Sequence, residues 1–174
     1  ILSNGAKVIL KKTDFKADEI NMMAVAKGGT SVYGNDKTAD LMFMPAVLEQ
    51  HGLGNFTNSD LSKLLAGKQL SLKITLDDYV RSLSGNTTPK DLKTYMEMIY
   101  MTFTGLTVTP DEFVAMQNLY KGVIQNQEQN PSFVFQKKVQ EFLYASPSKQ
   151  VFGVSDLEKA NRENILSIIR EQLA

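Results

Sequence analysis

The stretch that decides the fold is residues 70–85, which read LSLKITLDDYVRSLSG. Apolar and polar residues alternate from Leu70 to Asp77, which predicts a strand with one buried side and one solvent-facing side. Asp77-Asp78 offers a tight connection to the segment Tyr79–Gly85, whereas a parallel pairing would need a crossover of about a dozen residues. We therefore expect an antiparallel hairpin here, in a sheet that is at least partly antiparallel.

Two further strands are expected near the start of the chain. Apolar residues alternate with others over Ala6–Leu10 and over Glu19–Ala26, and Gly28-Gly29 ends the pair. The Asn4-Gly5 dipeptide is a strong hairpin signal, but it leaves only three residues for a strand before the turn. We therefore expect that strand to begin upstream of Ile1.

Two helical segments are expected before the residue 70–85 hairpin, and the second of them is short. Lys37–His51 has helical character but contains Pro45, which costs about 3 kcal/mol inside a helix. This favours a kink or a late start near Met44. Thr57 followed by Asp60 resembles an N-cap with an acid at the third helical position, and this predicts a short helix after it.

Three longer helices are expected in the second half. Thr88-Pro89 resembles a helix start, with threonine as N-cap and proline at the first helical position, while Thr109-Pro110 and Pro131 mark breaks. Each helix has one apolar stripe: Leu92, Met96, Ile99 and Phe103; Phe113, Met116, Tyr120 and Val123; Phe135, Val139 and Phe142. A last helix is expected over Asn161–Ala174. The expected fold is α+β, with a mostly antiparallel sheet covered on one face by several helices, these three among them.

Size, charge and composition restrict the class of protein. The 174 residues fit a single domain. Nineteen Lys+Arg balance nineteen Asp+Glu, without the basic patch that nucleic-acid binding needs. No apolar run approaches the roughly 20 residues that cross a bilayer, and cysteine is absent, which excludes disulfides and thiolate chemistry. We expect no nucleic-acid partner and no membrane span.

The sequence offers little for catalysis. A catalytic zinc commonly needs two histidines and a carboxylate, and the chain has one histidine, His51. Glu49 lies two positions away, which on a helix places it on a different face. A Ser-His-Asp triad would need the same histidine, and no G-x-S-x-G elbow presents a serine. We interpret His51 as a residue at a helix end or in a loop.

The remaining polar clusters have structural interpretations. Gly28–Ser31 and Ala66–Lys68 match neither phosphate-binding glycine motif and are interpreted as strand and helix ends. Asp77-Asp78 fits a turn, and Asp111-Glu112 fits the first turn of a helix. The eight methionines are interpreted mainly as core residues: Met22, Met23, Met42, Met44, Met96, Met98, Met101 and Met116. We therefore predict no catalytic, cofactor-binding or metal-binding residue in residues 1–174.

Five runs in order carry a family resemblance: Leu2–Lys11, Gly28–Ser31, Leu61–Lys68, Leu83–Leu92 and Met98–Thr104. Together they resemble the insulinase/pitrilysin-type zinc metallopeptidases, specifically the first domain of their C-terminal half. The resemblance implies similar α+β domains paired into two bowl-shaped halves that enclose a peptide. It also implies a zinc ion in a different, catalytic domain, where an H-x-x-E-H motif follows the first strands and its glutamate activates water.

The equivalent helix of this chain does not carry that motif in any register. With Glu49 as the glutamate, the two histidine positions fall on Ala46 and Gln50. With His51 as the final histidine, the glutamate position is Gln50 and the first histidine position is Val47. None of the family's catalytic residues can be carried over, so we expect residues 1–174 to be a single non-catalytic peptidase-like domain.

Three functions follow as hypotheses. The favoured one is a non-catalytic domain of a multidomain zinc metalloendopeptidase, which forms chamber wall and interdomain contacts around a peptide substrate. The alternative is a catalytically inactive scaffold or assembly subunit of the same family. The third is an independent enzyme with an unrecognised site, and it predicts turnover by the isolated chain after treatment with a chelator.

The favoured hypothesis also sets expectations about partners and location. The expected partners are the other domains of the parent peptidase and the peptide in its chamber, and oligomerisation is left open. We expect no cofactor in this segment and zinc in the parent's catalytic domain. Asn161–Ala174 reaches the last residue without a helix stop signal, so we expect a fragment excised from a longer chain. We expect the protein to be exported, with a periplasmic location.

Overall fold

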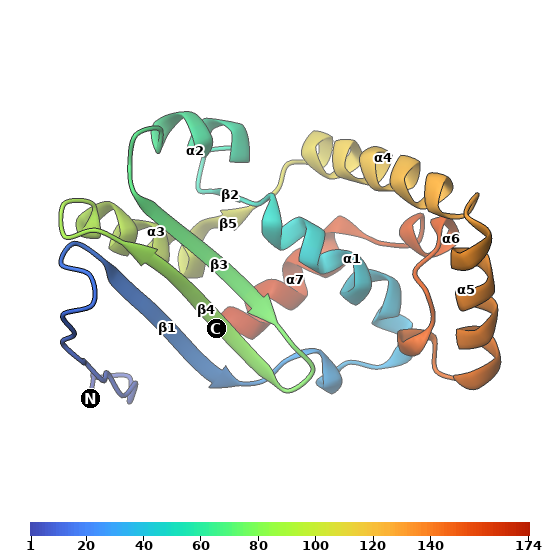
Figure 1. The fold of residues 1–174 in the computed structure, drawn as a ribbon, viewed down its shortest axis with the longest axis horizontal. Coiled ribbons are helices and arrows are strands. Elements are labelled where there is room, and N and C mark those ends of the chain that lie inside the picture. The colour runs from blue at the N-terminus through green and yellow to red at the C-terminus, as the bar shows by residue number, and fades with distance from the viewer.

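The computed structural model describes all residues 1–174 and has seven α-helices and five strands. Figure 1 shows how they are arranged. The strands are β1 (Ile20–Lys27), β2 (Gly52–Leu53), β3 (Leu70–Leu76), β4 (Val80–Thr87) and β5 (Leu106–Thr107). The helices are α1 (Thr38–Glu49), α2 (Asn58–Leu64), α3 (Leu92–Gly105), α4 (Pro110–Gln127), α5 (Pro131–Leu143), α6 (Val154–Leu157) and α7 (Arg162–Leu173). No helix combines the length and the apolar character that crossing a bilayer requires.

The main sheet is antiparallel, with strand order β1-β4-β3. Ala24 of β1 lies opposite Leu83 of β4, and Leu83 lies opposite Ile74 of β3. Leu83 and Ile74 are buried, so these rows of side chains define the inner face. The hairpin predicted from residues 70–85 is confirmed, and so is a strand close to Glu19–Ala26. A separate antiparallel pair joins β2 to β5.

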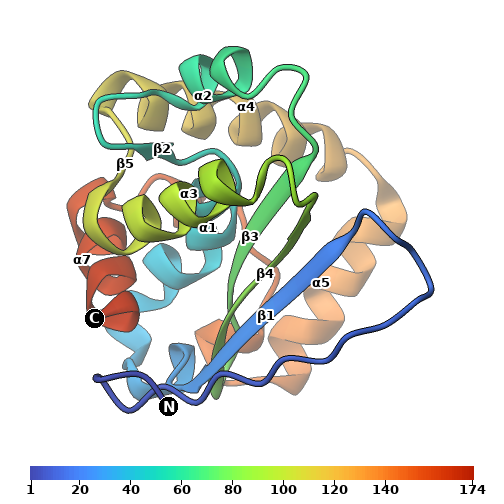
Figure 2. The ribbon, with the colours of Figure 1, turned by 90° about the vertical axis from the view of Figure 1, so that its left-hand side faces the viewer.

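Helices cover only the inner face of the sheet. Figures 1 and 2 show α1, α3 and α7 on one side of β1, β4 and β3, while α4, α5 and α6 extend beyond the sheet. Helices α1 and α3 both contact β3, and α7 packs on α1. The predicted α+β class, with one helix-covered face of an antiparallel sheet, is confirmed.

The core is centred on α1. The ring of Phe43 packs edge-to-face against Phe113 and Tyr120 of α4, with centroids 5.6 Å and 5.5 Å apart. Ile165 and Ile169 of α7 are fully buried in the same cluster. Aromatic pairs in this geometry add about 1 kcal/mol each to their burial, so α1, α4 and α7 are held together by apolar contacts.

The prediction of a strand over Ala6–Leu10 is wrong for this structure. The Asn4-Gly5 turn forms, because the N–H of Gly5 donates to the carbonyl of Leu2 at 2.9 Å, but the residues after it have no strand partner. Leu10 is 90% exposed. The alternating pattern is present, but a strand needs a neighbour and this segment lies off the sheet.

The expected late start of the first helix is also wrong. Helix α1 runs through Pro45 without interruption from Thr38 to Glu49. Pro45 is on the exposed side of the helix, whereas Met44 and Val47 are each 1% exposed. Burial of such side chains stabilises by about 2 kcal/mol each and offsets the missing hydrogen bond.

Helix α3 begins three residues later than predicted, and the side of it that faces the core is not the predicted one. It begins at Leu92 rather than Pro89, because residues 88–91 form a turn. Of the predicted stripe, Met96 and Phe103 are 50% and 51% exposed, whereas Tyr95 is fully buried. The apolar stripe is therefore shared between the inner side of the helix and an exposed face.

Helices α4 and α5 do not cover the sheet as expected. Helix α4 packs on α6 and α1, and α5 has no buried residue, with Phe135 and Phe142 72% and 88% exposed. The helical periodicity was correct, but a stripe does not identify the surface that it faces. The prediction that the methionines are mainly core residues holds only in part, because Met44 and Met116 are buried whereas Met23 and Met96 are exposed.

Candidate functional site

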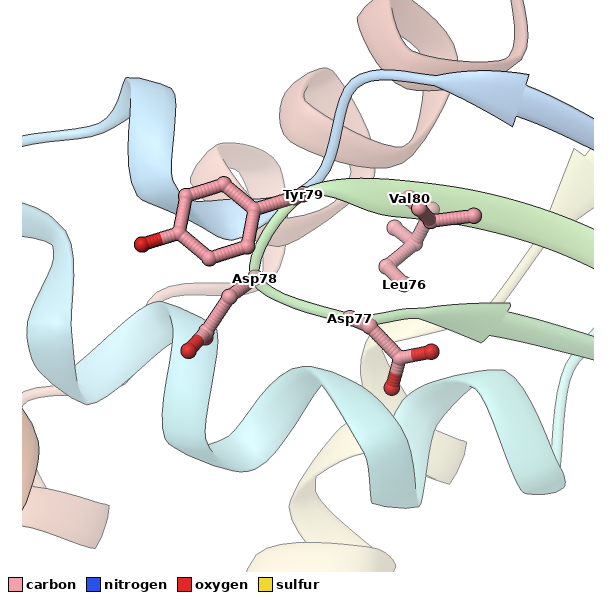
Figure 3. Close-up of a pocket in the computed structure, with 5 residues that line it drawn as sticks. All are labelled: Leu76, Asp77, Asp78, Tyr79 and Val80. Atoms are coloured by element: carbon pink, nitrogen blue, oxygen red, sulfur yellow. The ribbon is translucent and has the colours of Figure 1, made fainter.

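The β3–β4 turn carries a shallow, open hollow that is lined by the turn's own residues. Its volume is about 490 Å³, and Figure 3 shows the five lining residues, Leu76 to Val80, on the turn. Two backbone N–H groups, those of Thr30 and Ser31, donate to the carbonyls of Asp77 and Asp78, both at 2.9 Å. The turn is therefore bound to the loop that follows β1.

Gly29 is required by this close contact. Its φ of 104° is in a region that favours glycine, and a Cβ there would lie 2.3 Å from the carbonyl oxygen of Asp77. The glycines of Gly28–Ser31 stand at the end of β1, as predicted, where they allow the backbones to pack closely.

The two carboxylates of the turn do not form an acid–base pair. Figure 3 shows the side chains of Asp77 and Asp78 extending from the turn without converging. One oxygen of Asp78 accepts a hydrogen bond from the Thr30 hydroxyl at 3.2 Å, and the other lies 4.0 Å from the ammonium of Lys149. Such exposed contacts contribute little to stability, and they leave the pair in the structural role expected of a turn.

The other acidic pair also has a local role. The carboxylate of Glu112 accepts from the Thr109 N–H at 2.8 Å, and the Glu112 N–H donates to the Thr109 hydroxyl at 3.2 Å. This is a capping box at the start of α4. Thr57 and Asp60 form the same arrangement at α2, which confirms that predicted N-cap.

His51 lies at the end of α1, as expected. Its Nδ1 is 2.7 Å from the carbonyl oxygen of Leu48 and donates to it, which places the proton on that nitrogen. Burial lowers the pKa of the imidazole below its ordinary value of 6.5, and the bond to Leu48 opposes this in part. Glu49 is exposed, while Ala46 and Val47 are buried in the core.

The residues present do not fit a zinc ion. No three His, Cys, Asp or Glu side chains gather where they could hold a metal. No chemical step in this chain can therefore be assigned to zinc.

The sequence interpretation missed a buried polar cluster at the end of α7. Gln172 is 6% exposed, and its side chain accepts from the Gly29 N–H at 2.8 Å and donates to the Tyr33 hydroxyl at 3.1 Å. Arg81 donates to the backbone carbonyl of Gln172, so its positive charge lies at the negative end of the helix dipole. The sequence could have indicated that Gln172 is buried, because position 172 continues the apolar stripe of α7 through Ile165 and Ile169.

A second missed contact joins the start of α7 to α1. Asp40 is 4% exposed and accepts from the Asn161 N–H at 2.7 Å and from the Asn164 side chain at 3.0 Å. Both ends of α7 are thus fixed by polar groups that lie more than a hundred residues away in the chain.

A cleft of about 690 Å³ opens on the inner face of the sheet beside β1. Its walls include Ala24 and Ala26 of β1, Phe103 of α3 and Leu173 of α7, and Arg81 is the only charged side chain among its lining residues. This mostly apolar cleft lies near the free edge of the sheet.

The chain is similar in sequence and in fold to zinc peptidases of the insulinase/pitrilysin type, the resemblance that the sequence predicted. The chain is similar to the probable zinc protease PqqL of Haemophilus influenzae, with 26% identity over 97 residues, 56% of this chain and 10% of that protein. It is 19% identical to PqqL of Escherichia coli over 170 residues, 98% of this chain and 18% of that protein.

Solved structures agree with the relatives found by sequence. The periplasmic protease PqqL from Escherichia coli matches 98% of this chain and 19% of its own, with a TM-score of 0.77 and 18% identity. A peptidase M16 inactive domain from Pseudomonas fluorescens matches 87% of this chain and 38% of its own, with a TM-score of 0.68 and 12% identity. No family model matches the chain. The chain spans less than a fifth of the curated relatives it resembles.

Proposed function

We propose that residues 1–174 form a non-catalytic domain of a multidomain zinc metalloendopeptidase, contributing chamber wall and interdomain contacts around a peptide substrate. The observation that carries the proposal is the fold match to the protease PqqL, which covers 98% of this chain but only 19% of the protease. A unit that equals one segment of a much longer peptidase is best explained as one of its domains.

The use of α1 supports a structural role. In the family, the helix after the first strands carries the zinc motif, and α1 is the corresponding helix here. Phe43, Val47 and Leu48 of α1 are buried in the core, and Val47 stands at one of the positions that the motif would need. The helix is therefore committed to packing.

The same proposal assigns partners, cofactor and location. Zinc belongs to a catalytic domain elsewhere in the parent, and the partners are the other domains and the enclosed peptide. An exported location is supported by the structural similarity to PqqL of Escherichia coli, which is a periplasmic protease.

The alternative is an inactive scaffold of the same family. It has the same fold and the same packed α1, and it differs in predicting that no H-x-x-E-H motif occurs in the parent or in its partner chain. The sequence of the parent open reading frame separates the two.

The decisive experiment measures zinc and peptide cleavage for the full-length parent protein and its variants. We expect one zinc per chain, loss of zinc and cleavage when histidines of an H-x-x-E-H motif outside residues 1–174 are replaced, and no change for His51→Ala. Glu49→Ala is the matched control on α1. A parent without zinc and without cleavage would favour the scaffold.

The isolated chain gives the opposing test. Residues 1–174 should bind no stoichiometric zinc and cleave no peptide library. One tight zinc per isolated chain, lost in His51→Ala, would overturn the proposal.

A further inference from the structure

Helix α5 lies at the end of the molecule, beyond the sheet (Figure 1). Phe135, Val139 and Phe142, which we call the α5 stripe, follow one another at helical spacing. Such a stripe normally faces the core of its own domain. Here α5 has no buried residue, and Phe135 and Phe142 are 72% and 88% exposed. The two rings therefore lie outside the core of this domain.

The opposite side of α5 is the one that is held against the domain. The ammonium of Lys137 lies 2.9 Å from a carboxylate oxygen of Glu128, directly after α4, and a Cβ at Gly153 would lie 3.2 Å from the same ammonium. Residues two positions apart on a helix differ by about 200° in direction, so Phe135 is on the far side of the helix from Lys137. The polar contacts of α5 are thus directed inward and its apolar stripe outward.

Contacts at both ends of α5 fix this orientation. Asn130 caps the start of the helix, because its side chain accepts from the Ser132 N–H at 2.9 Å, and Pro131 occupies the first helical position. At the other end, the side chain of Gln150 donates to the carbonyl oxygen of Tyr144 at 3.1 Å. A rotation that turned the stripe inward would break the ion pair on the opposite side, so the exposed stripe belongs to the folded domain.

The residues around the α5 stripe have the composition of an interface. Leu143, next to Phe142, is 61% exposed and widens the apolar area. Lys138 and Glu141 lie along one side and pair with each other at 2.7 Å, and the exposed Gln136 lies on the other. An aromatic centre with a polar rim is typical of protein interfaces, and exposed apolar patches with such a rim mark interaction sites.

We propose that the α5 stripe docks onto an apolar groove of another domain of the same parent chain. The inference rests on the proposed function, because it assigns one interdomain contact of the peptidase to a named surface. The matched protease PqqL supports it, since this chain covers only 19% of that protein. Most of a parent of that kind lies outside residues 1–174 and can supply the groove.

The size of the patch favours a partner in the same chain over a second copy of this domain. Two phenylalanine rings with these exposures offer an apolar area on the order of 300 Å², whereas a stable complex between separate proteins buries about 800 Å² per partner. Within one chain, a linker holds the two surfaces at an effective concentration of about millimolar. A smaller contact is therefore sufficient for docking between domains.

Hydroxyl-radical footprinting of the full-length parent tests the proposal, because it reports how far solvent reaches each side chain. The oxidation rate of Phe142 in the folded parent is compared with its rate in the same protein unfolded in urea. An undocked stripe predicts nearly equal rates, since Phe142 is 88% exposed within this domain. A docked stripe predicts a rate that is lower by about tenfold or more, because interface cores pack as densely as protein interiors.

A matched pair of variants of the full-length parent shows whether the stripe itself makes the contact. Phe135→Asp places a charge that docking would strip of water, so Phe142 should be oxidised at close to its unfolded rate. Gln136→Asp adds the same charge about 100° around the helix and should leave Phe142 protected. The core residue Phe43, which is 1% exposed, should stay protected in both variants and thereby shows that the domain is folded. Equal rates at Phe142 in the two variants would overturn the proposal.

Two results for the natural parent would also overturn it. Oxidation of Phe142 at its unfolded rate would show that α5 is exposed in the assembled protein. Protection that disappears on dilution would identify a second copy as the occupant, because a contact within one chain does not depend on protein concentration.

The outcome is separate from that of the proposed function, because footprinting depends on neither zinc nor cleavage. A parent that binds zinc and cleaves peptides while Phe142 is unprotected would overturn the docking of α5 alone. A parent without zinc and without cleavage, in which Phe142 is protected at all concentrations, would keep the docking and favour the scaffold.

Discussion

Replacing Tyr95 by phenylalanine is expected to stabilise the domain by about 1 kcal/mol. Tyr95 is fully buried on α3, and its hydroxyl has no hydrogen-bond partner. The hydroxyl lies under the sheet, where a Cβ at Gly85 would be only 2.7 Å from it. Burial also raises the pKa of this phenol, so the group stays neutral and unpaired.

The magnitude follows from two opposing terms. A buried hydroxyl without a partner costs about 1–3 kcal/mol relative to water. Removing its oxygen leaves a void of roughly 10 Å³, which at about 24 cal/mol per Å³ costs about 0.2 kcal/mol. The balance favours Tyr95→Phe, and in a chain of this size a gain of 1 kcal/mol raises Tm by about 2–4 °C.

Urea unfolding followed by far-ultraviolet circular dichroism measures the effect. The midpoint should rise with an unchanged slope, which identifies a change in stability rather than in exposed surface. Tyr100→Phe is the control, since Tyr100 is on the same helix and 69% exposed, and it should change stability by less than about 0.5 kcal/mol. A loss of 1 kcal/mol or more in Tyr95→Phe would refute the reasoning, because it would mean that the hydroxyl is bonded.

Three further substitutions test other contacts. Gly29→Ala should destabilise by about 3 kcal/mol through strain and collision with the β3–β4 turn, whereas Gly122→Ala, with open space around it, should stabilise by about 0.5–1 kcal/mol; similar values in urea unfolding would argue against the collision. Gln172→Ala should cost about 1–3 kcal/mol because it leaves the Gly29 N–H unpaired, while the exposed Glu171→Ala should be nearly neutral; equal melting temperatures would contradict this role. Burial lowers the pKa of His51 in the folded state, so the folded protein favours the neutral imidazole. The free energy of unfolding should therefore be highest above pH 6.5 and should fall as the pH drops from there toward the folded pKa. His51→Gln should flatten this part of the curve of unfolding free energy against pH, and an unchanged slope would contradict the assignment.

The sequence predicted elements whose signals are local. The alternation through Ile74 needs only neighbouring residues, and the Thr57 cap needs only Asp60. The sequence interpretation failed where burial depends on contacts between distant elements. Tyr95 and Met96 are both apolar enough for a core, and only the position of the sheet makes Tyr95 buried and Met96 exposed. The same limit applies to Ala6–Leu10, whose pattern is that of a strand although no strand of the sheet pairs with it.

The candidate site shows the same division. His51 and the two acidic pairs could be interpreted from sequence, because helix ends and turns are local. The polar contacts of Gln172 and Asp40 could not be paired from sequence, since their partners are 143 and 121 residues away. Periodicity could indicate that Gln172 is buried, but not what it binds.

The anchoring of α7 also has a consequence for how the chain folds during synthesis. The sheet and α1 can form early, but the bonds from Gln172 to Gly29 and from Asn161 to Asp40 close loops of more than a hundred residues. Contacts of such high sequence separation slow folding. The apolar surface of α1 that α7 covers therefore remains exposed until α7 has left the ribosome, and exposed apolar surface of this kind favours aggregation or chaperone binding.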